Sequence, residues 1–178
     1  MYHVGDLILY ESSGVCKVMD VTMRGLAGKN KEQLYYVLEP LYQNYIIFTL
    51  VNTTKVFMRP IISKNEAEQL VDMMPTVQAR TYHNLVLSQL TQHYNALLKT
   101  HDCLDLVKLS ISLRAKKQGM EQQKRKFGAV DERFMKHAEE LLFGELAAAL
   151  KIPKDKVPEY IADRVNEKRS DNENGFNA

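Results

Sequence analysis

The hydrophobic pattern of the chain changes its period once, near residue 63, and this change constrains the fold more than any other feature. Before it, short apolar runs are separated by turn residues, with no helix-length segment between them. After it, apolar residues recur every three or four positions, which is the helical period. Strand-type runs followed by helix-type runs do not build a parallel α/β sheet. The sequence therefore predicts an α+β fold, with the boundary between its parts at residues 60–75.

The first part should contain five short strands, at residues 7–10, 15–21, 34–38, 45–51 and 56–62. The Gly- and Lys-rich segment 25–31 is expected to be a hairpin loop. Pro60 fits an edge strand, because proline cannot donate a hydrogen bond to a neighbouring strand. Several short strands separated by turn signals are typical of a small antiparallel barrel or a strongly bent sheet, which we place at residues 1–62.

The second part should be an all-helical domain, which we place at residues 63–168. Ser63 and Glu66 form a capping-box pattern at the start of a helix that reaches Met73. Further helices are expected from Val77 to Leu98, from an Asp102 cap to Gly119, from Asp131 to the Ile152–Pro153 stop, and from Asp155 to Glu167. Residues 169–178 are polar and are predicted to form a flexible tail.

Composition and motif searches exclude several classes of protein. The longest nearly apolar run, residues 45–51, is far shorter than the roughly 20 residues of a membrane-spanning helix. We expect a soluble cytoplasmic protein without membrane contact. The two cysteines, Cys16 and Cys103, are too far apart for a disulfide framework or a paired metal site. No histidine pair, phosphate loop or nucleophile motif has the required spacing, so we expect no catalytic residue, metal or cofactor, and no enzyme activity.

The cations are concentrated in one stretch, although the whole chain carries a net charge of only +2. Residues 108–126 contain a single acid, Glu121, among the cations Lys108, Arg114, Lys116, Lys117, Lys124, Arg125 and Lys126. A basic stripe on a nearly neutral protein is expected where one face meets phosphates. The alternative is a solvated helix end, which is the commoner origin of a charge run.

Aromatic residues are concentrated in the first 60 residues. We assign most of them to the core and to cross-strand pairs. The clustered Tyr42 and Tyr45 are candidates for a partner-binding face, because Tyr supplies contact area at a low entropy cost.

Several segments together resemble the CarD family of bacterial transcription regulators. They are YHVGDLILYESSGVCKVMDV, QLYYVLEPL, LVNT, MRPIIS and DERFMKHAEELLFGELAAAL, and their order covers about residues 1–165. The resemblance implies a Tudor-like N-terminal domain, shared with transcription-repair coupling factors, that docks on the β subunit of RNA polymerase. It also implies a helical C-terminal domain that contacts promoter DNA just upstream of the melted region, without sequence specificity, and stabilises the open complex.

The resemblance also implies site residues. Arg24 falls where the family uses an Arg to contact the polymerase, whereas the position of a second such Arg holds Ile47 or Phe48, which suggests a more apolar contact. The family's minor-groove Trp is replaced by Leu87, and Tyr82 is the nearest aromatic residue. The apolar stripe of the predicted helix 77–98 nonetheless favours a core position for Leu87. The expected DNA-binding cations are Lys99, Arg114, Lys116, Lys117, Lys124, Arg125, Lys126, Arg133 and Lys136.

Two other functions remain open at this point. A paralogue could keep the polymerase dock but lose the side chain that packs into the DNA minor groove, which we call the wedge. Such a protein would act as a pure interaction module. A Tudor-like domain could also serve an RNA- or ribosome-binding adaptor. We expect a monomer in each case.

Overall fold

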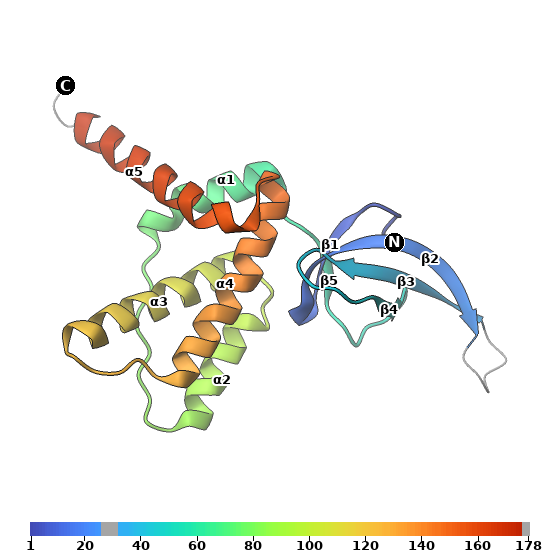
Figure 1. Cartoon of the computed structure of the whole chain (residues 1–178), viewed down its shortest axis with the longest axis horizontal. Helices are drawn as coiled ribbons and strands as arrows, with labels where there is room; N and C mark the ends of the chain where they lie inside the picture. The colour runs from blue at the N-terminus through green and yellow to red at the C-terminus, as the bar shows by residue number, and fades with distance from the viewer. Residues whose placement is uncertain (26–31, 176–178) are drawn as a thin grey trace. The chain divides into compact units, whose positions relative to one another are not determined.

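The computed structural model of the chain describes residues 1–25 and 32–175 (Figure 1). The chain divides into two compact units, Met1–Ile62 and Ser63–Ala178. The first is built on an antiparallel sheet and the second on helices, so the predicted α+β class is confirmed.

The N-terminal unit contains one five-stranded sheet with the order β4-β3-β2-β1-β5. Its strands are β1 (Leu7–Tyr10), β2 (Gly14–Gly25), β3 (Glu32–Pro40), β4 (Ile47–Leu50) and β5 (Met58–Pro60), with a 3-10 turn, η1 (Glu11–Ser13), after β1. All neighbouring strands are antiparallel. The sheet is open rather than closed into the predicted barrel. Its edge strands β4 and β5 have only four and three residues, and Pro60 donates no ladder hydrogen bond. The predicted edge position of Pro60 is confirmed.

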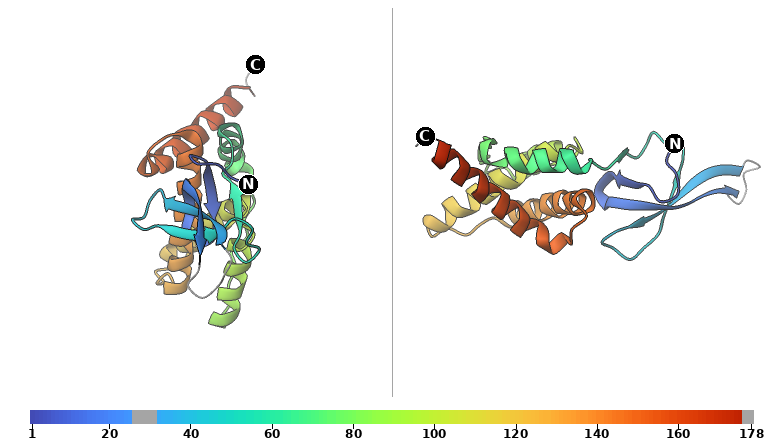
Figure 2. Two further views of the ribbon diagram at one scale, coloured as in Figure 1. Left: turned by 90° about the vertical axis from the view of Figure 1, so that its right-hand side faces the viewer. Right: turned by 90° about the horizontal axis from the view of Figure 1, so that it is seen from above.

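Strands β2 and β3 form a long hairpin (Figure 2), and the register between them decides which side chains lie on each face of the sheet. The pairing of Val18 with Leu38 and of Asp20 with Val37 leaves one extra residue in β2, a β-bulge. The bulge lets both Val18 and Val21 pack on the core side. The buried core there consists of Ile8, Cys16, Val18, Tyr36 and Leu38. Most of the predicted loop 25–31, namely residues 26–31, lies outside the described residues.

The C-terminal unit contains α1 (Lys64–Met73), η2 (Met74–Thr76), α2 (Leu87–Leu98), α3 (Cys103–Gln122), α4 (Ala129–Leu150), η3 (Lys154–Lys156) and α5 (Val157–Gly175). The predicted capping box is confirmed. The Glu66 amide donates to Ser63 Oγ at 3.2 Å, and the Ser63 amide donates to Glu66 Oε2 at 2.7 Å. Asp102 caps α3 as predicted, accepting from the amides of Leu104 and Asp105.

Two predicted helix starts were wrong. Residues 77–86 are not helical, and α2 begins only at Leu87. Just before the helix, Asn84 Oδ1 accepts a hydrogen bond from the Val86 amide, a local turn that competes with helix at residues 84–86. Helix α4 begins at Ala129, two residues before the predicted cap. Asp131 does not cap it, because its side chain is buried.

Two predicted helix ends were also wrong. Helix α3 continues past Gly119 to Gln122, since an isolated helical glycine weakens a helix without ending it. Helix α5 continues past Glu167 to Gly175, so most of the predicted tail is helical backbone. Residues 176–178 lie outside the described residues.

Three helices, α2, α3 and α4, pack side by side and form the body of this unit (Figure 1). Helix α5 is joined to α1 by a two-pronged ion pair. Arg164 Nε lies 2.6 Å from Asp72 Oδ1, and Arg164 Nη2 lies 3.2 Å from Asp72 Oδ2. Within the described residues, no helix has both the length and the apolar character needed to cross a bilayer.

Candidate protein and nucleic-acid interfaces

Arg24 and Phe48 form one exposed feature on the outer face of the sheet. The Arg24 guanidinium carbon lies 3.7 Å from the centre of the Phe48 ring. Phe48 pairs with Val37, and Val37 pairs with Asp20, so alternation along β2 places Arg24 on the same face as Phe48. A guanidinium over an aromatic ring is a cation–π contact. The structure thus brings together two of the three residues expected to contact a polymerase.

Ile47, the third expected docking residue, does not lie beside Arg24 and Phe48. It points to the opposite face of the sheet and packs against the hydrophobic core. Phe48 is 43% exposed. Strand β4 is also an edge strand, paired with β3 on one side. An edge strand can accept a strand from another protein through backbone hydrogen bonds.

Exposed apolar residues continue from Phe48 into the loop between β3 and β4. We call Leu41, Tyr42, Tyr45, Ile46 and Phe48 the β3–β4 surface, and all five are exposed. The expectation that Tyr42 and Tyr45 lie outside the core is therefore confirmed. Tyr45 is steadied by a long hydrogen bond from its hydroxyl to Ser13 Oγ, at 3.4 Å. Grouped exposed hydrophobic residues of this kind are typical of a protein-binding surface.

A groove of about 610 Å³ lies in the C-terminal unit, between residues 81–90, the end of α3 and residues 123–131. Leu85 and Leu87 line one wall, and Arg125 and Lys126 line another. Lys116 and Asp131 also line it. The groove therefore combines apolar side chains with cations from a part of the chain about forty residues away.

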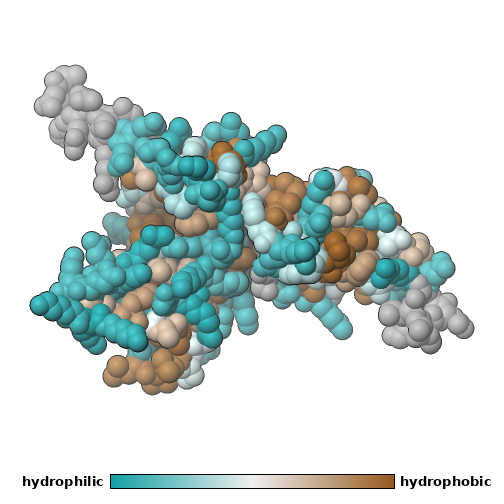
Figure 3. Space-filling model, viewed as in Figure 1, coloured by the Kyte–Doolittle hydropathy of each residue, from teal (hydrophilic) through white to brown (hydrophobic). Residues whose placement is uncertain are grey.

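Leu85, Val86 and Leu87 form an exposed apolar tip at the start of α2, and we call these three residues the apolar tip. Brown surface lies at this end of the unit in Figure 3. Leu87 is 62% exposed, so the predicted core position was wrong. The buried stripe of α2 begins one turn later, at Leu90 and Tyr94. Asn84 supports the tip by donating from Nδ2 to Tyr82 Oη at 3.1 Å and to Gln89 Oε1 at 2.8 Å.

Tyr82 does not project as a wedge. Its ring stacks on His93 with the ring centres 3.9 Å apart, and it meets the edge of Tyr94 at 6.5 Å. Burial lowers the pKa of His93, which favours the neutral imidazole in this stack. Of the two candidates for the family's wedge, Leu87 is the one on the surface.

The cations of the connection between α3 and α4 are exposed. Lys124 adopts a left-handed backbone conformation with φ of 54°, and the Arg125 amide donates to the Met120 carbonyl at 2.8 Å. This turn ends α3 and displays Lys124, Arg125 and Lys126, which we call the basic turn.

Further cations surround Glu132 at the start of α4. Lys136 donates to this carboxylate, with an Nζ–Oε1 distance of 3.0 Å, and lowers its pKa. The charges of Lys117 and Lys126 add to that effect. Lys117 also lies 6.0 Å from the Phe127 ring centre. Glu132 thus neutralises part of the positive charge beside the basic turn.

Four other predicted DNA contacts are not part of the exposed basic turn or of the cations around Glu132. Lys116 is only 7% exposed and is paired with Asp131, so its predicted phosphate contact was wrong. Arg133 lies over the Phe134 ring at 5.1 Å. Lys99 is exposed at the end of α2, outside the groove lining. Arg114 Nε is bound to Glu139 Oε1 at 2.6 Å.

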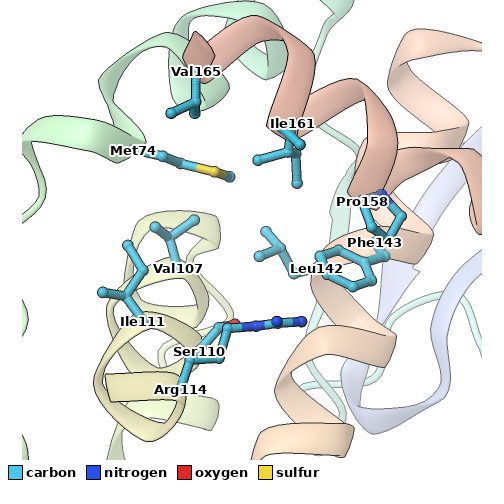
Figure 4. A pocket seen from close by; sticks show the side chains of 11 residues that line it. Met74, Val107, Ser110, Ile111, Arg114, Leu142, Phe143, Pro158, Ile161 and Val165 are labelled. Atoms are coloured by element: carbon cyan, nitrogen blue, oxygen red, sulfur yellow. The ribbon is translucent and has the colours of Figure 1, made fainter. Parts of the chain in front are cut away.

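Arg114 belongs to a separate cavity of about 300 Å³ between α3, α4 and α5 (Figure 4). Apart from Ser110 and Arg114, its lining is apolar: Met74, Val107, Ile111, Leu142, Phe143, Pro158, Ile161, Ala162 and Val165. Ser110 Oγ also donates to Glu139, at 3.1 Å. The positive charge of Arg114 is therefore neutralised by Glu139 within the helical unit. No cluster of three or more metal-ligand side chains occurs in the part of the chain that the structure describes.

Sequence reasoning missed two parts of the groove. The apolar tip had a local signal, since three consecutive apolar residues follow Asn84 at a helix start. The buried contact of Lys116 with Asp131 had no such signal, because the two residues are brought together only by helix packing.

Residues 2–62 match the family model of the CarD-like/TRCF RID domain. The match ends where the N-terminal unit ends, and it includes the sheet, Arg24, Phe48 and the β3–β4 surface. The N-terminal unit is therefore similar to a CarD-like/TRCF RID domain, in agreement with the resemblance seen in the sequence. No curated protein matches the chain at a significant level.

Proposed function

We propose that this chain is a bacterial regulator of transcription initiation that docks on the β subunit of RNA polymerase and stabilises the open promoter complex. The observation that carries the DNA half of the proposal is the groove, which brings Leu85 and Leu87 of the apolar tip together with Arg125 and Lys126 of the basic turn. The family match of residues 2–62 supports the polymerase half. In this proposal the chain is a cytoplasmic monomer without catalytic activity or a cofactor.

The polymerase dock consists of Arg24, Phe48 and the free edge of β4. Edge pairing supplies backbone hydrogen bonds, and the side chains beside the edge supply specificity. The exposed Phe48 replaces a polar contact with an apolar one, which fits the exposed β3–β4 surface next to it. We also propose that the open, bent sheet is a Tudor-like domain that has not closed into a barrel.

The DNA contact is expected to be independent of sequence. The basic turn supplies Lys and Arg side chains, which bind phosphates and fix position without reading bases. The apolar tip supplies Leu side chains, which can press against or between base pairs in a minor groove, where partial unstacking is offset by the added contact. This combination suits the edge of a melted region, where bases are already partly unstacked.

Such a factor acts by differential binding. It stabilises the open complex only to the extent that it binds the open promoter more tightly than the closed one. Docking on the polymerase raises the local concentration of the DNA-binding unit, so a weak DNA contact is sufficient.

The proposal is tested by retrieving partners of the chain from a native extract and then measuring the lifetime of open complexes at two promoters of different melting difficulty. RNA polymerase should be retrieved, and the lifetime should increase at both promoters. Polymerase retrieval without a change in lifetime would instead identify an interaction module that has lost its wedge. Retrieval of ribosomes in place of polymerase would identify an RNA-binding adaptor.

A further inference from the structure

Three polar side chains meet in the interior of the helical unit, beneath the proposed DNA groove. Lys116 Nζ lies 2.9 Å from each oxygen of the Asp131 carboxylate. The Tyr94 hydroxyl donates to Asp131 Oδ1 at 2.7 Å and accepts from Lys116 Nζ at 3.4 Å. All three residues are buried. The three donors of the ammonium group thus have three acceptors, and we call these residues the polar triad.

Each member of the polar triad lies on a different helix, and Lys116 and Asp131 also line the groove. Tyr94 lies on α2, two turns after the apolar tip. Lys116 lies on α3, two turns before the basic turn. Asp131 lies in the first turn of α4, just after that turn ends. One charged cluster therefore joins the helix that begins with the tip to both helices that hold the basic turn.

Stability alone is a weak reason for such a cluster. Removing two charges from water is costly, and replacing a buried ion pair by apolar residues of similar volume is often neutral or stabilising. An ion pair does, however, require specific distances and angles, which an apolar contact does not. A buried pair therefore fixes the relative positions of the elements that carry it.

Gly128 gives independent evidence that the carboxylate position is tightly set. A Cβ atom at this residue would lie 3.0 Å from Asp131 Oδ2. The backbone at the end of the basic turn thus packs directly against the polar triad, and a side chain at residue 128 would push against the carboxylate.

We propose that Lys116, Asp131 and Tyr94 are positioning residues that set the separation between the apolar tip and the basic turn, so that both reach one DNA molecule together. The effect on DNA rests on the proposed function. The effect on the separation does not, and the two are measured separately.

The separation is measured by spin labels at Leu85→Cys and Gln123→Cys, two exposed positions on opposite walls, in the full chain. Cys16 and Cys103 are buried and should stay unlabelled. Lys116→Met with Asp131→Leu should broaden the distance distribution by several ångströms. The same pair of changes, without labels, should weaken binding to a fork-junction DNA at least tenfold, although no surface charge is removed.

Lys108→Met is the matched control, because Lys108 lies on the same helix outside the groove and pairs with Asp105 at 3.0 Å. It should change neither measurement. If the double variant does not fold, Tyr94→Phe carries the test, since it removes one hydroxyl and should give a smaller broadening with several-fold weaker binding.

An unchanged distance distribution in a folded triad variant would overturn the positioning role, whatever happens to DNA binding. A broadened distribution with unchanged DNA affinity would overturn the link between the triad and DNA. If the unsubstituted chain binds no DNA, the proposed function fails, and the distance measurement still decides whether the triad positions the groove walls.

Discussion

The Arg24 guanidinium carbon lies 3.7 Å from the centre of the Phe48 ring, although the strands that carry them, β2 and β4, are separated by β3. The contact holds a long cationic side chain flat on the outer face of the sheet. It also keeps the aromatic ring at the edge, where a partner can reach it. The two residues therefore form one binding feature rather than two.

Arg24→Glu should weaken retention of RNA polymerase, because it reverses the charge at the dock and removes the contact with Phe48. Phe48→Ala should have a similar effect, with each change costing at least about 2 kcal/mol of binding free energy if the pair is a hot spot. Affinity measurements with purified polymerase check this.

The control for both changes is Lys17→Glu, an exposed residue of β2 distant in register from Arg24. A double-mutant cycle then measures whether the two residues act together. Equal retention of all variants by polymerase would remove Arg24 and Phe48 from the dock.

Changing Lys124, Arg125 and Lys126 together to Gln should reduce DNA affinity and its dependence on salt. Each phosphate contact contributes about 0.9 to the slope of log affinity against log salt for duplex DNA, so the slope should fall by about 2.7 if all three bind phosphates. Titrations between low and moderate salt provide the slope.

The charge-matched control changes Lys64, Lys108 and Lys156 to Gln. All three cations lie outside the groove lining and have acidic partners. This control should keep most of the slope. Equal slopes for the two triple variants would mean that the basic turn is a solvated helix end.

Leu87→Ser should shorten the lifetime of open promoter complexes while changing the free energy of unfolding by less than about 0.5 kcal/mol, because Leu87 is exposed and away from the core. Filter-binding decay after heparin challenge measures the lifetime, and urea unfolding measures the stability.

Leu90→Ala, in the same helix, is the contrasting variant. Leu90 is 4% exposed, so its truncation should destabilise the helical unit by about 2–5 kcal/mol. If Leu87→Ser leaves the lifetime unchanged, the apolar tip does not act on the promoter.

The stability of the N-terminal unit should fall as pH rises from 9 to 11. Burial raises the pKa of the Cys16 thiol from 9.0 to about 11. In this window the unfolded thiol loses its proton while the folded thiol keeps it, so the unfolded state is favoured as pH rises. Urea unfolding at several pH values measures the effect.

Other groups also titrate between pH 9 and 11, so the informative quantity is the difference between the unsubstituted chain and Cys16→Ala. The variant should be less stable at pH 8, because the site is fully buried, but should lose less stability on going to pH 11. Parallel pH curves for the two chains would show that Cys16 does not titrate as its burial implies.

Local sequence determined the features whose interacting groups lie within a few residues. Ser63 and Glu66 are three residues apart, so their reciprocal hydrogen bonds and the start of α1 follow from that spacing. Asp102 caps α3 for the same reason. The five strands followed from short apolar runs, and Pro60 placed one of them at an edge, because a missing amide hydrogen has the same consequence in any sheet.

Only the tertiary structure decided which side chains are available to a partner. Lys116 and Lys117 are equivalent in sequence, yet packing against Asp131 buries the first and leaves the second beside the basic turn. Leu87 and Leu90 fit the same helical stripe, yet only Leu90 is covered, because the helix begins at Leu87. Arg24 meets Phe48 through the register of three strands. Burial and contact between distant residues depend on how whole elements pack, and no local spacing encodes that.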